Sequence, residues 1–375
     1  MVKIFVAGDY CPQLRIAEML LQSDYSFFDE LKNCVQDSDY AIVNFECPVV
    51  NGEVEPIQKC GPALRTRQNA IDSIVYAGFD GVTLANNHFK DFGNAGCEAT
   101  LRELKFQGVD YVGGGLNLAE AQQILYKEIK GKKIAIVNFC ENEFSIATDY
   151  EAGAAPMDVV DNYYQITEAR RNADYVLVIV HGGHEYYQLP SPRMKKLYRY
   201  YVALGADAVV NHHQHCYSGY EYYCGKPIVY GLGNLCFDSE KERQSIWNEG
   251  YCVRLGFDDK ITLELIPYTQ CDEMPIVKII TDRIGFDFRV KELNTIIEND
   301  KALQNKFTAW IDRQINHKMN IFASYHNRYL NAAANRGYIP RLVLKQEILG
   351  LINHINCEAH RDTTIGVLTT LMKTK

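Results

Sequence analysis

Short apolar runs alternate with longer amphipathic stretches over about the first 270 residues of the chain. The short runs have the length and composition of strands, and the stretches between them place apolar residues at helical spacing. We expect strands at 3–7, 40–44, 81–85, 110–113, 133–139, 174–180, 207–211, 226–231, 250–257 and 261–268. We expect helices at about 26–37, 67–77, 93–107, 117–123, 158–172 and 191–204. This alternation predicts an α/β domain in which helices cover a sheet.

Two connections are too short to hold a crossover helix. Residues 130–133 (Lys-Gly-Lys-Lys) and 258–260 (Asp-Asp-Lys) each join two apolar runs directly, which predicts hairpins of antiparallel strands. We therefore expect a mixed sheet and disfavour a doubly wound Rossmann sheet. The first strand also lacks a following Gly-x-Gly-x-x-Gly, and the glycine run at 113–115 comes after a later strand.

The pattern becomes helical after about residue 275. Residues 288–334 and 343–372 place apolar side chains at helical spacing, and Pro340 separates the two segments. We therefore expect a main domain over residues 1–275 and a helical C-terminal extension over residues 276–375. The apolar face of this extension either packs on the main domain or serves as a partner-docking surface or a lid.

Composition is that of a globular enzyme-sized protein. Of the 375 residues 47% are apolar and 23% are charged, and the net charge of −8 argues against a general nucleic-acid binder. No run approaches the roughly 20 apolar residues of a membrane helix, and the first residues have the pattern of a strand, not of a signal peptide. The 12 cysteines form no Cys-x-x-Cys pair, so we expect reduced thiols, a cytoplasmic protein and no zinc ribbon.

Five predicted strands end in residues that can bind a metal ion. These strand ends carry Asp9, Glu46, Asn86-Asn87-His88, His181 and His212-His213-Gln214-His215. One His or Asp at a strand end is usually a cap, a turn or a satisfied imidazole, but five predict convergence at one edge of the fold. His213 and His215 would point to the same face of an extended chain. Mixed oxygen and nitrogen ligands suit Mn²⁺, Fe, Zn²⁺ or Ni²⁺ better than Ca²⁺ or Mg²⁺.

These segments resemble the CapA (PGA_cap, poly-γ-glutamate capsule synthesis protein) family, which is similar to calcineurin-like metallophosphoesterases. The matching stretches are Ala7–Asp9, Asn44–Pro48, Gly78–His88 with Asp91–Gly93, His181–Glu185, Gly205–His215 and Tyr230–Asp238. They follow the family's order over about residues 1–270. The resemblance implies a four-layer αββα sandwich of the metallophosphoesterase type, with a site at one edge of two stacked sheets and one or two divalent metal ions.

The resemblance also implies a role for each matching residue. Asp9 and His215 would bind a first metal ion, and Glu46 would bridge it to a second. The second ion would be held by Asn87, His181 and His213, and His88 would act as general acid or hydrogen-bond donor. The expected metal ligands are thus Asp9, Glu46, Asn87, His181, His213 and His215; the expected catalytic residues are His88 and Asn86; and the expected substrate-binding residues are His212, Glu185 and Arg65.

Three positions depart from the family pattern. Cys11 stands where metallophosphoesterases place a His, which leaves open whether one or two metal ions bind. Cys11 is either a thiolate ligand or a small buried thiol. Gly182 replaces a usual Trp, so an aromatic wall of the pocket is expected to be missing, and Asn211 replaces a usual Gly.

The residues and the resemblance together predict a metal-dependent hydrolase, a phosphoesterase acting on a phosphoester or on an anionic polymer or envelope intermediate. A metal ion supplies the nucleophile that phosphoester hydrolysis lacks at neutral pH, and the same chemistry suits an amide bond. The alternative is a non-catalytic accessory protein of capsule (poly-γ-glutamate) biosynthesis that binds a polyanion or a synthase subunit. We expect an anionic substrate and no nucleic acid, and we leave a homo-oligomer or a synthase partner open.

Overall fold

The computed structural model describes residues 1–59, 61–319 and 327–340. The chain divides into two compact units, Met1–Gln304 and Asn305–Lys375. The first unit thus extends beyond residue 275, where the sequence pattern changes. The domain boundary expected at that residue stays a prediction.

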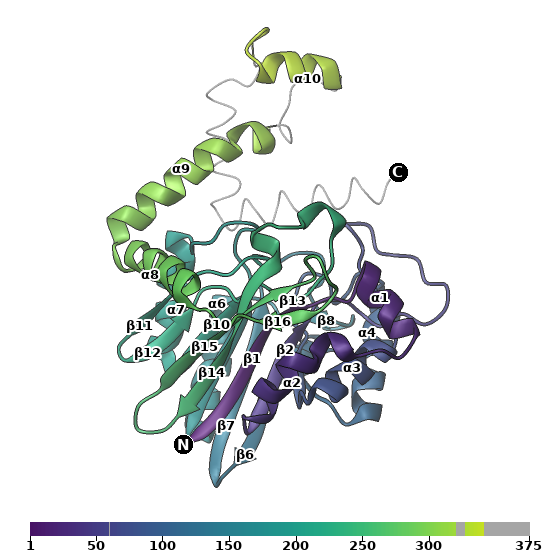
Figure 1. The fold of residues 1–375 in the computed structure, drawn as a ribbon, viewed down its shortest axis with the longest axis vertical. Coiled ribbons are helices and arrows are strands. Elements are labelled where there is room, and N and C mark those ends of the chain that lie inside the picture. Colours follow the sequence, from purple (N-terminus) through teal and green to yellow (C-terminus); the bar gives the residue numbers. More distant parts are fainter. Residues whose placement is uncertain (60, 320–326, 341–375) are drawn as a thin grey trace. The chain divides into compact units, whose positions relative to one another are not determined.

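Two large β-sheets form the body of the first unit (Figure 1). One sheet has the order β16-β15-β14-β1-β2-β3-β4, with β13 also pairing β1. Its strands are β1 (Val2–Tyr10), β2 (Tyr40–Phe45), β3 (Gly81–Thr83), β4 (Asp110–Val112), β13 (Asn234–Cys236), β14 (Glu249–Phe257), β15 (Thr262–Gln270) and β16 (Val277–Ile279). Strands β1 to β4 run parallel, whereas β14, β15 and β16 are antiparallel to their neighbours.

The other large sheet has the order β11-β12-β10-β9-β7-β6. Its strands are β6 (Leu125–Ile129), β7 (Lys132–Cys140), β9 (Tyr175–His181), β10 (Ala208–His212), β11 (Tyr220–Tyr223) and β12 (Lys226–Val229), and a small separate pair is formed by β5 (Gly114–Gly115) and β8 (Gly153–Ala154). The predicted turns at 130–133 and 258–260 join antiparallel pairs, β6 with β7 and β14 with β15. Both hairpin predictions are confirmed.

Helices cover the outer face of each large sheet. The helices are α1 (Leu14–Leu21), α2 (Asp29–Gln36), α3 (Asn69–Ala77) and α4 (Gly93–Gln107) beside the first sheet, α6 (Val159–Asn172) and α7 (Pro192–Leu204) beside the second, and the short α5 (Leu118–Ala121) next to β5. The 3₁₀ turns are η1 (Ser26–Phe28), η2 (Glu240–Glu242) and η3 (Ile246–Asn248). The resulting layers, helix, sheet, sheet and helix, confirm the predicted αββα sandwich.

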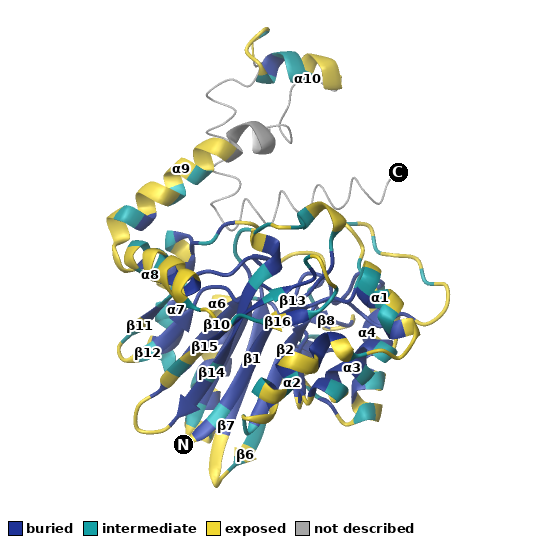
Figure 2. Cartoon of the chain, viewed as in Figure 1, coloured by how far each residue is buried: buried dark blue, intermediate teal, exposed yellow. Residues whose placement is uncertain are grey.

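The two sheets stack because alternate residues of their strands are apolar on the facing sides. In β1, Ile4 and Val6 belong to a buried cluster that also contains Ile136 of β7 and Ile179 of β9. The residue between them, Phe5, points the other way and contacts Phe79 next to the helical layer. Both faces of these strands are therefore buried, which explains why they read as continuous apolar runs. Figure 2 shows the strands buried and the outer faces of the helices exposed.

Some short elements were not predicted. Helix α1, strand β11 and strand β13 fall outside the expected ranges. Strand β13 pairs with β1 only through Asn234 opposite Asp9 and Cys236 opposite Tyr10. So few residues carry no recognisable period, and only the neighbouring strand makes this segment extended.

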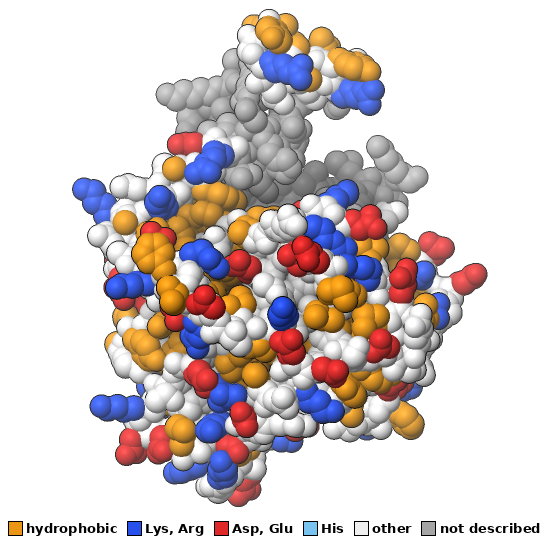
Figure 3. Space-filling view, in the orientation of Figure 1, with side chains coloured by type: hydrophobic (Ala, Val, Ile, Leu, Met, Phe, Trp, Pro, Cys, Tyr) orange, Lys and Arg blue, Asp and Glu red, His pale blue; other side chains and the backbone are white. Residues whose placement is uncertain are grey.

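Strand β16 (Val277–Ile279) opens the segment after residue 275, and helices follow it in the part of the chain that the structure describes. Helices α8 (Ile284–Glu298), α9 (Asp300–Met319) and α10 (Arg328–Asn335) lie within or close to the predicted range 288–334, whereas the range 343–372 lies outside the described residues. Helix α8 packs next to β11, and its Phe286 ring contacts Tyr217 and Tyr251. Among the described helices, none combines the length and the apolar character needed to cross a bilayer. Acidic and basic side chains are interspersed on the face shown in Figure 3.

Packing between the sheets should dominate the stability of the first unit. We expect Ile179→Ala, at a fully buried position of β9, to lower the free energy of unfolding by about 2–5 kcal/mol in chemical denaturation. Val160→Ala, at a 63% exposed position of α6, is the control and should change it by less than about 0.5 kcal/mol. Equal effects of the two substitutions would contradict the assigned core.

Candidate metal centre

Strands of both large sheets end at one edge of the fold. Asp9 lies near the end of β1, and Glu46 directly follows β2, which runs parallel to β1. His181 and His212 are the last residues of β9 and β10, and they lie opposite each other in that parallel pair. A hydrogen-bond distance of 3.1 Å between His212 Nδ1 and Asp9 Oδ1 joins the two edges. The convergence expected from the sequence is therefore present in the structure.

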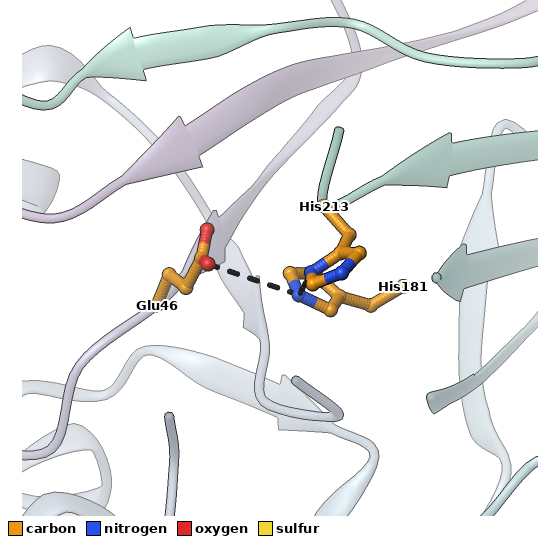
Figure 4. Close-up of side chains that lie close together, drawn as sticks. All are labelled: Glu46, His181 and His213. Carbon is orange, nitrogen blue, oxygen red and sulfur yellow. Dashed lines mark hydrogen bonds and ion pairs between the residues drawn. The ribbon is translucent and has the colours of Figure 1, made fainter. Parts of the chain in front are cut away.

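Glu46 is shared by two groups of donor atoms. Its Oε1 lies 3.8 Å from Nε2 of His181 and 3.9 Å from Nε2 of His215. The two groups are Glu46-His181-His213 and Asp9-Glu46-His215, and within each the donor atoms lie within 4.8 Å of one another. Figure 4 shows the first group, with the Glu46 carboxylate directed toward the two rings. A single buried carboxylate thus belongs to two potential ligand sets.

The donor atoms at this edge are suited to a cation. Glu46 is fully buried, and its Oε1 has no hydrogen-bond partner among the described residues. Burial and the nearby Asp9 raise the pKa of Glu46 well above its usual range. Burial lowers the pKa of His181, and burial with the neighbouring His215 lowers that of His213 to about 4, so both rings are neutral at pH 7. Neutral imidazole is the form that binds a metal ion, and a cation would stabilise the Glu46 carboxylate.

Asp9 is held as an anion by its neighbours. Its carboxylate accepts a hydrogen bond of 2.7 Å from Asn44 Nδ2 and one of 3.2 Å from the backbone N–H of His213. Burial alone would raise the pKa of Asp9, but the hydrogen bond with His212 and the nearby imidazoles lower it below its usual range. This carboxylate is therefore charged at neutral pH, as a metal ligand must be.

Two buried asparagines orient the ligands, and neither was among the predicted site residues. Asn44 bonds to Asp9 and its Nδ2 also lies 3.3 Å from Nδ1 of His181. Asn234 of β13 has Oδ1 at 2.9 Å from Nδ1 of His215, and its Nδ2 donates to the His215 carbonyl. Such partners fix which ring nitrogen faces a metal ion. Both residues lie within stretches that carry the family resemblance, but the sequence assigned neither of them a role.

The segment after β10 has an unusual backbone. His213 and His215 have φ angles of +93° and +55°, in the region that favours glycine. The chain here is therefore not extended, and the spacing argument for a shared face does not apply. The two rings nevertheless lie 6.1 Å apart, centroid to centroid. Backbone strain of this kind persists where the surroundings enforce it, and such positions cluster at functional sites.

His88 is fixed through a carboxylate. Its Nδ1 lies 2.7 Å from Oδ2 of Asp91, and Asp91 also forms a buried ion pair with Lys59. Burial lowers the pKa of His88, while the hydrogen bond with Asp91 partly opposes this shift. Because Nδ1 lies against the Asp91 carboxylate, it carries the proton of the neutral ring, and Nε2 is left as an acceptor. Asp91 was not among the residues to which the sequence assigned a role.

The remaining predicted residues of this loop take two positions. Asn87 Oδ1 lies 3.0 Å from Nε2 of His181, next to the first group of donors. Asn86 is fully buried, its Nδ2 donates to the Phe45 carbonyl, and its Oδ1 accepts from the His88 backbone. Asn86 thus holds the loop that carries Asn87 and His88, and its catalytic role stays a prediction.

The three expected substrate-binding residues are dispersed. His212 is buried against Asp9, and Glu185 is exposed in the turn after β9. Arg65 is exposed, its guanidinium lies 5.5 Å from the ring centroid of Phe92, and it lines a cavity whose described lining includes none of the predicted metal ligands. Their roles in substrate binding stay predictions.

Comparison with known proteins assigns the chain to a family. The family model described as "Bacterial capsule synthesis protein PGA_cap" matches residues 3–239, a range that contains every predicted metal ligand. The chain belongs to the PGA_cap family.

The comparisons also find individual proteins to which the chain is similar. The chain is 34% identical over 306 residues to "Capsule biosynthesis protein CapA" of Bacillus anthracis, covering 79% of this chain and 73% of that protein. It is 29% identical over 170 residues to "Probable polyglutamine synthesis accessory protein Rv0574c" of Mycobacterium tuberculosis. This alignment covers 42% of this chain and 45% of that protein. A structural alignment with the 5'-nucleotidase precursor from Thermus thermophilus covers 82% of this chain and 59% of that chain. The two are 11% identical in sequence, and the TM-score is 0.43.

Cys11 departs from the pattern expected of a metallophosphoesterase-like member of this family. Its thiol is buried and accepts a hydrogen bond of 3.5 Å from Gln13 Nε2. Burial and the neighbouring Cys47 raise the pKa of the Cys11 thiol well above its usual value. Within the described residues Cys11 therefore has the character of a protonated buried thiol, the second of the two alternatives left open by the sequence.

Gly182 stands where the family resemblance leads us to expect a Trp. The structure gives a steric reason for a residue without a side chain at this position. A Cβ at this position would lie 2.6 Å from Cγ of Glu141, so the Glu141 side chain occupies the space. An aromatic wall lies elsewhere, where Trp247 packs 4.7 Å from the His215 ring and Tyr186 stacks on Trp247. The sequence missed this wall because Trp247 lies outside the motifs.

The close approach of Gly182 and Glu141 predicts a coupled pair. We expect Gly182→Ala to lower the free energy of unfolding by about 1–3 kcal/mol, since the new methyl group must displace the Glu141 side chain. In a Glu141→Ala background the same substitution should cost less than about 0.5 kcal/mol. Denaturation of the four proteins of this cycle measures the difference. Equal costs in both backgrounds would show that the steric explanation is wrong.

The raised pKa of Glu46 predicts a pH dependence of stability in metal-free protein. The folded state binds the Glu46 proton more tightly than the unfolded state does, so wild-type stability loses a contribution as pH rises above about 4.3. Glu46→Gln removes this loss. We expect the stability difference, variant minus wild type, to increase between pH 4.5 and 8 by up to about 1.4 kcal/mol per pH unit.

The matched control is Glu98→Gln on the exposed side of α4. Denaturation in the presence of a chelator measures all three proteins across the same pH range. A constant difference between wild type and Glu46→Gln would contradict the uncompensated burial of this carboxylate.

Proposed function

We propose that the chain is a metal-dependent hydrolase, most directly a phosphoesterase, that acts on an anionic substrate. The observation that carries the proposal is the buried Glu46 Oε1, which has no hydrogen-bond partner among the described residues and lies within 4 Å of ring nitrogens of His181 and His215. A buried carboxylate oxygen without a donor, close to imidazole nitrogens, is a poor structural feature in the absence of a cation. Membership of a capsule synthesis family is consistent with a polymer-related role.

Residues of this chain would divide the work between holding metal and moving a proton. Asp9 and His215 on one side, and His181, His213 and Asn87 on the other, would hold two divalent ions, Mn, Fe or Zn, with Glu46 between them. Such ions lower the pKa of a bound water and stabilise charge on the attacking and leaving oxygens. In its protonated form, which the Asp91 carboxylate stabilises, His88 would hold a proton at Nε2 for the leaving oxygen, and Asp91 would keep its ring in place.

A second candidate is a non-catalytic accessory role in capsule polymer synthesis. It is favoured by the relative named as a probable polyglutamine synthesis accessory protein. In this case the same edge would bind a polyanion or dock a synthase subunit without turnover. A third candidate, hydrolysis of an amide bond, uses the same metal ligands and differs only in the bond that is cleaved.

The variants separate ligands from the proton donor. In protein reconstituted with Mn²⁺, Fe²⁺ or Zn²⁺, we expect His88→Ala to retain its metal content and to lose about 10²–10⁴-fold in turnover of bis-p-nitrophenyl phosphate. Asp9→Ala and His215→Ala should lower the metal content itself, because each removes a donor from the group around Glu46. Elemental analysis and the colorimetric assay measure the two effects independently.

The control for these variants is Glu98→Gln, which should keep both metal and turnover. Equal metal loss in all three site variants would make His88 a ligand and contradict its assignment. If metal-loaded protein cleaves neither the phosphoester nor a γ-linked oligoglutamate but binds the latter, the accessory role is correct. If it cleaves only the oligoglutamate, the amide hydrolase is correct.

A further inference from the structure

A large cavity lies beside the metal centre and is not part of it. Its volume is about 810 Å³, and it is bounded by α1 and by the segment that joins β2 to α3. The lining comes from three short stretches, Pro12–Gln13, Val50–Gly52 and Arg65–Asn69, together with residues of α1. A space of this size can hold several units of a chain-like ligand.

The charge of the cavity has a single sign. Arg65 and Arg67 line it, and its described lining contains no carboxylate. Within the part of the chain that the structure describes, neither arginine forms an ion pair with an acidic side chain. Two exposed guanidinium groups without acidic partners offer forked donors that match carboxylates and phosphates.

Other lining residues favour a ligand with an apolar part. Ala17, Leu20, Leu21 and Val50 present aliphatic surface to the same space. A chain that combines carboxylate groups with methylene groups can contact both the arginines and this aliphatic wall. A polyphosphate chain has no apolar atoms and could use only the arginines, so the lining favours a polycarboxylate.

Hydrogen bonds tie the cavity to the metal centre. Gln13 Nε2 donates to the Arg65 carbonyl at 3.0 Å and to the thiol of Cys11, two residues after Asp9. On the other side, the backbone N–H of Leu64 donates to Asp91 at 2.7 Å, and Asp91 holds His88. The segment that carries the arginines is thus hydrogen-bonded to Gln13, close in sequence to Asp9, and to Asp91, which holds His88.

We propose that this cavity is a subsite that binds a carboxylate-bearing chain, with Arg65 and Arg67 as its anion-binding residues, and so extends substrate recognition beyond the metal ions. This assignment deepens the proposed function. It rests on that function only for the direction in which the bound carboxylate-bearing ligand runs. Binding of the chain itself requires no turnover, which separates the two proposals experimentally.

The test measures binding of a fluorescent γ-linked octaglutamate to the full-length protein by anisotropy, at fixed moderate salt. We expect Arg65→Ala/Arg67→Ala to weaken this binding about tenfold or more, because two charge-assisted contacts are lost. The control is Arg102→Ala, an exposed arginine of α4 outside the cavity lining, which should bind within about twofold of wild type. Thermal unfolding of each variant verifies that it is folded.

Three results would overturn the assignment. They are the absence of octaglutamate binding to wild-type protein, equal binding by wild type and the double variant, and a similar loss in Arg102→Ala. Tripolyphosphate in place of octaglutamate distinguishes the ligand chemistry, and tighter arginine-dependent binding of tripolyphosphate would overturn the choice of a polycarboxylate. Arg65→Lys/Arg67→Lys, which keeps the charge without the fork, should restore part of the affinity and serves if the alanine variant is unstable. Failure of the phosphoesterase assay alone would leave these binding results intact.

Discussion

The central constraint in this structure is the burial of one carboxylate where no described residue donates a hydrogen bond to one of its oxygens. Glu46 follows a strand that is buried on both faces, so its side chain cannot reach water. Around it stand rings that burial keeps neutral and a second carboxylate that is already anionic. Removing a charge from water in this way is unfavourable unless a cation is close. This is the reason for our proposal that metal ions complete the site.

Polar residues around Glu46 orient the other potential metal ligands. Asn44 and Asn234 orient one imidazole or carboxylate each, from strands that are neighbours of β1. Without such partners the rings could rotate, and their lone pairs would not converge. The positive φ angles of His213 and His215 belong to the same requirement, since a regular continuation of β10 would carry these rings in other directions. Local strain is accepted here because the whole edge depends on where the rings point.

The segment between β2 and α3 connects the chemistry with recognition. It begins at Glu46, supplies Lys59 to the Asp91 carboxylate, and then carries the two arginines of the cavity before α3 begins at Asn69. One connection therefore contributes a carboxylate to the proposed metal centre, a partner to the carboxylate that positions His88, and two exposed arginines to the cavity.

The sequence pattern by itself predicted an α/β domain with antiparallel hairpins and a set of residue types that can bind a metal ion, whereas the four-layer arrangement was implied by the family resemblance. Continuous apolar runs gave the buried strands, short polar turns gave the hairpins, and Asp9, Glu46, His181 and His213 each stood at the end of a run, where parallel strands bring their ends together. Tertiary structure alone decided which partners complete the site. Asn44, Asn234, Lys59 and Trp247 come from segments far apart in the chain, and no local period marks them. The space taken by Glu141 beside Gly182 is likewise a contact across two strands, which no pattern along one strand can encode.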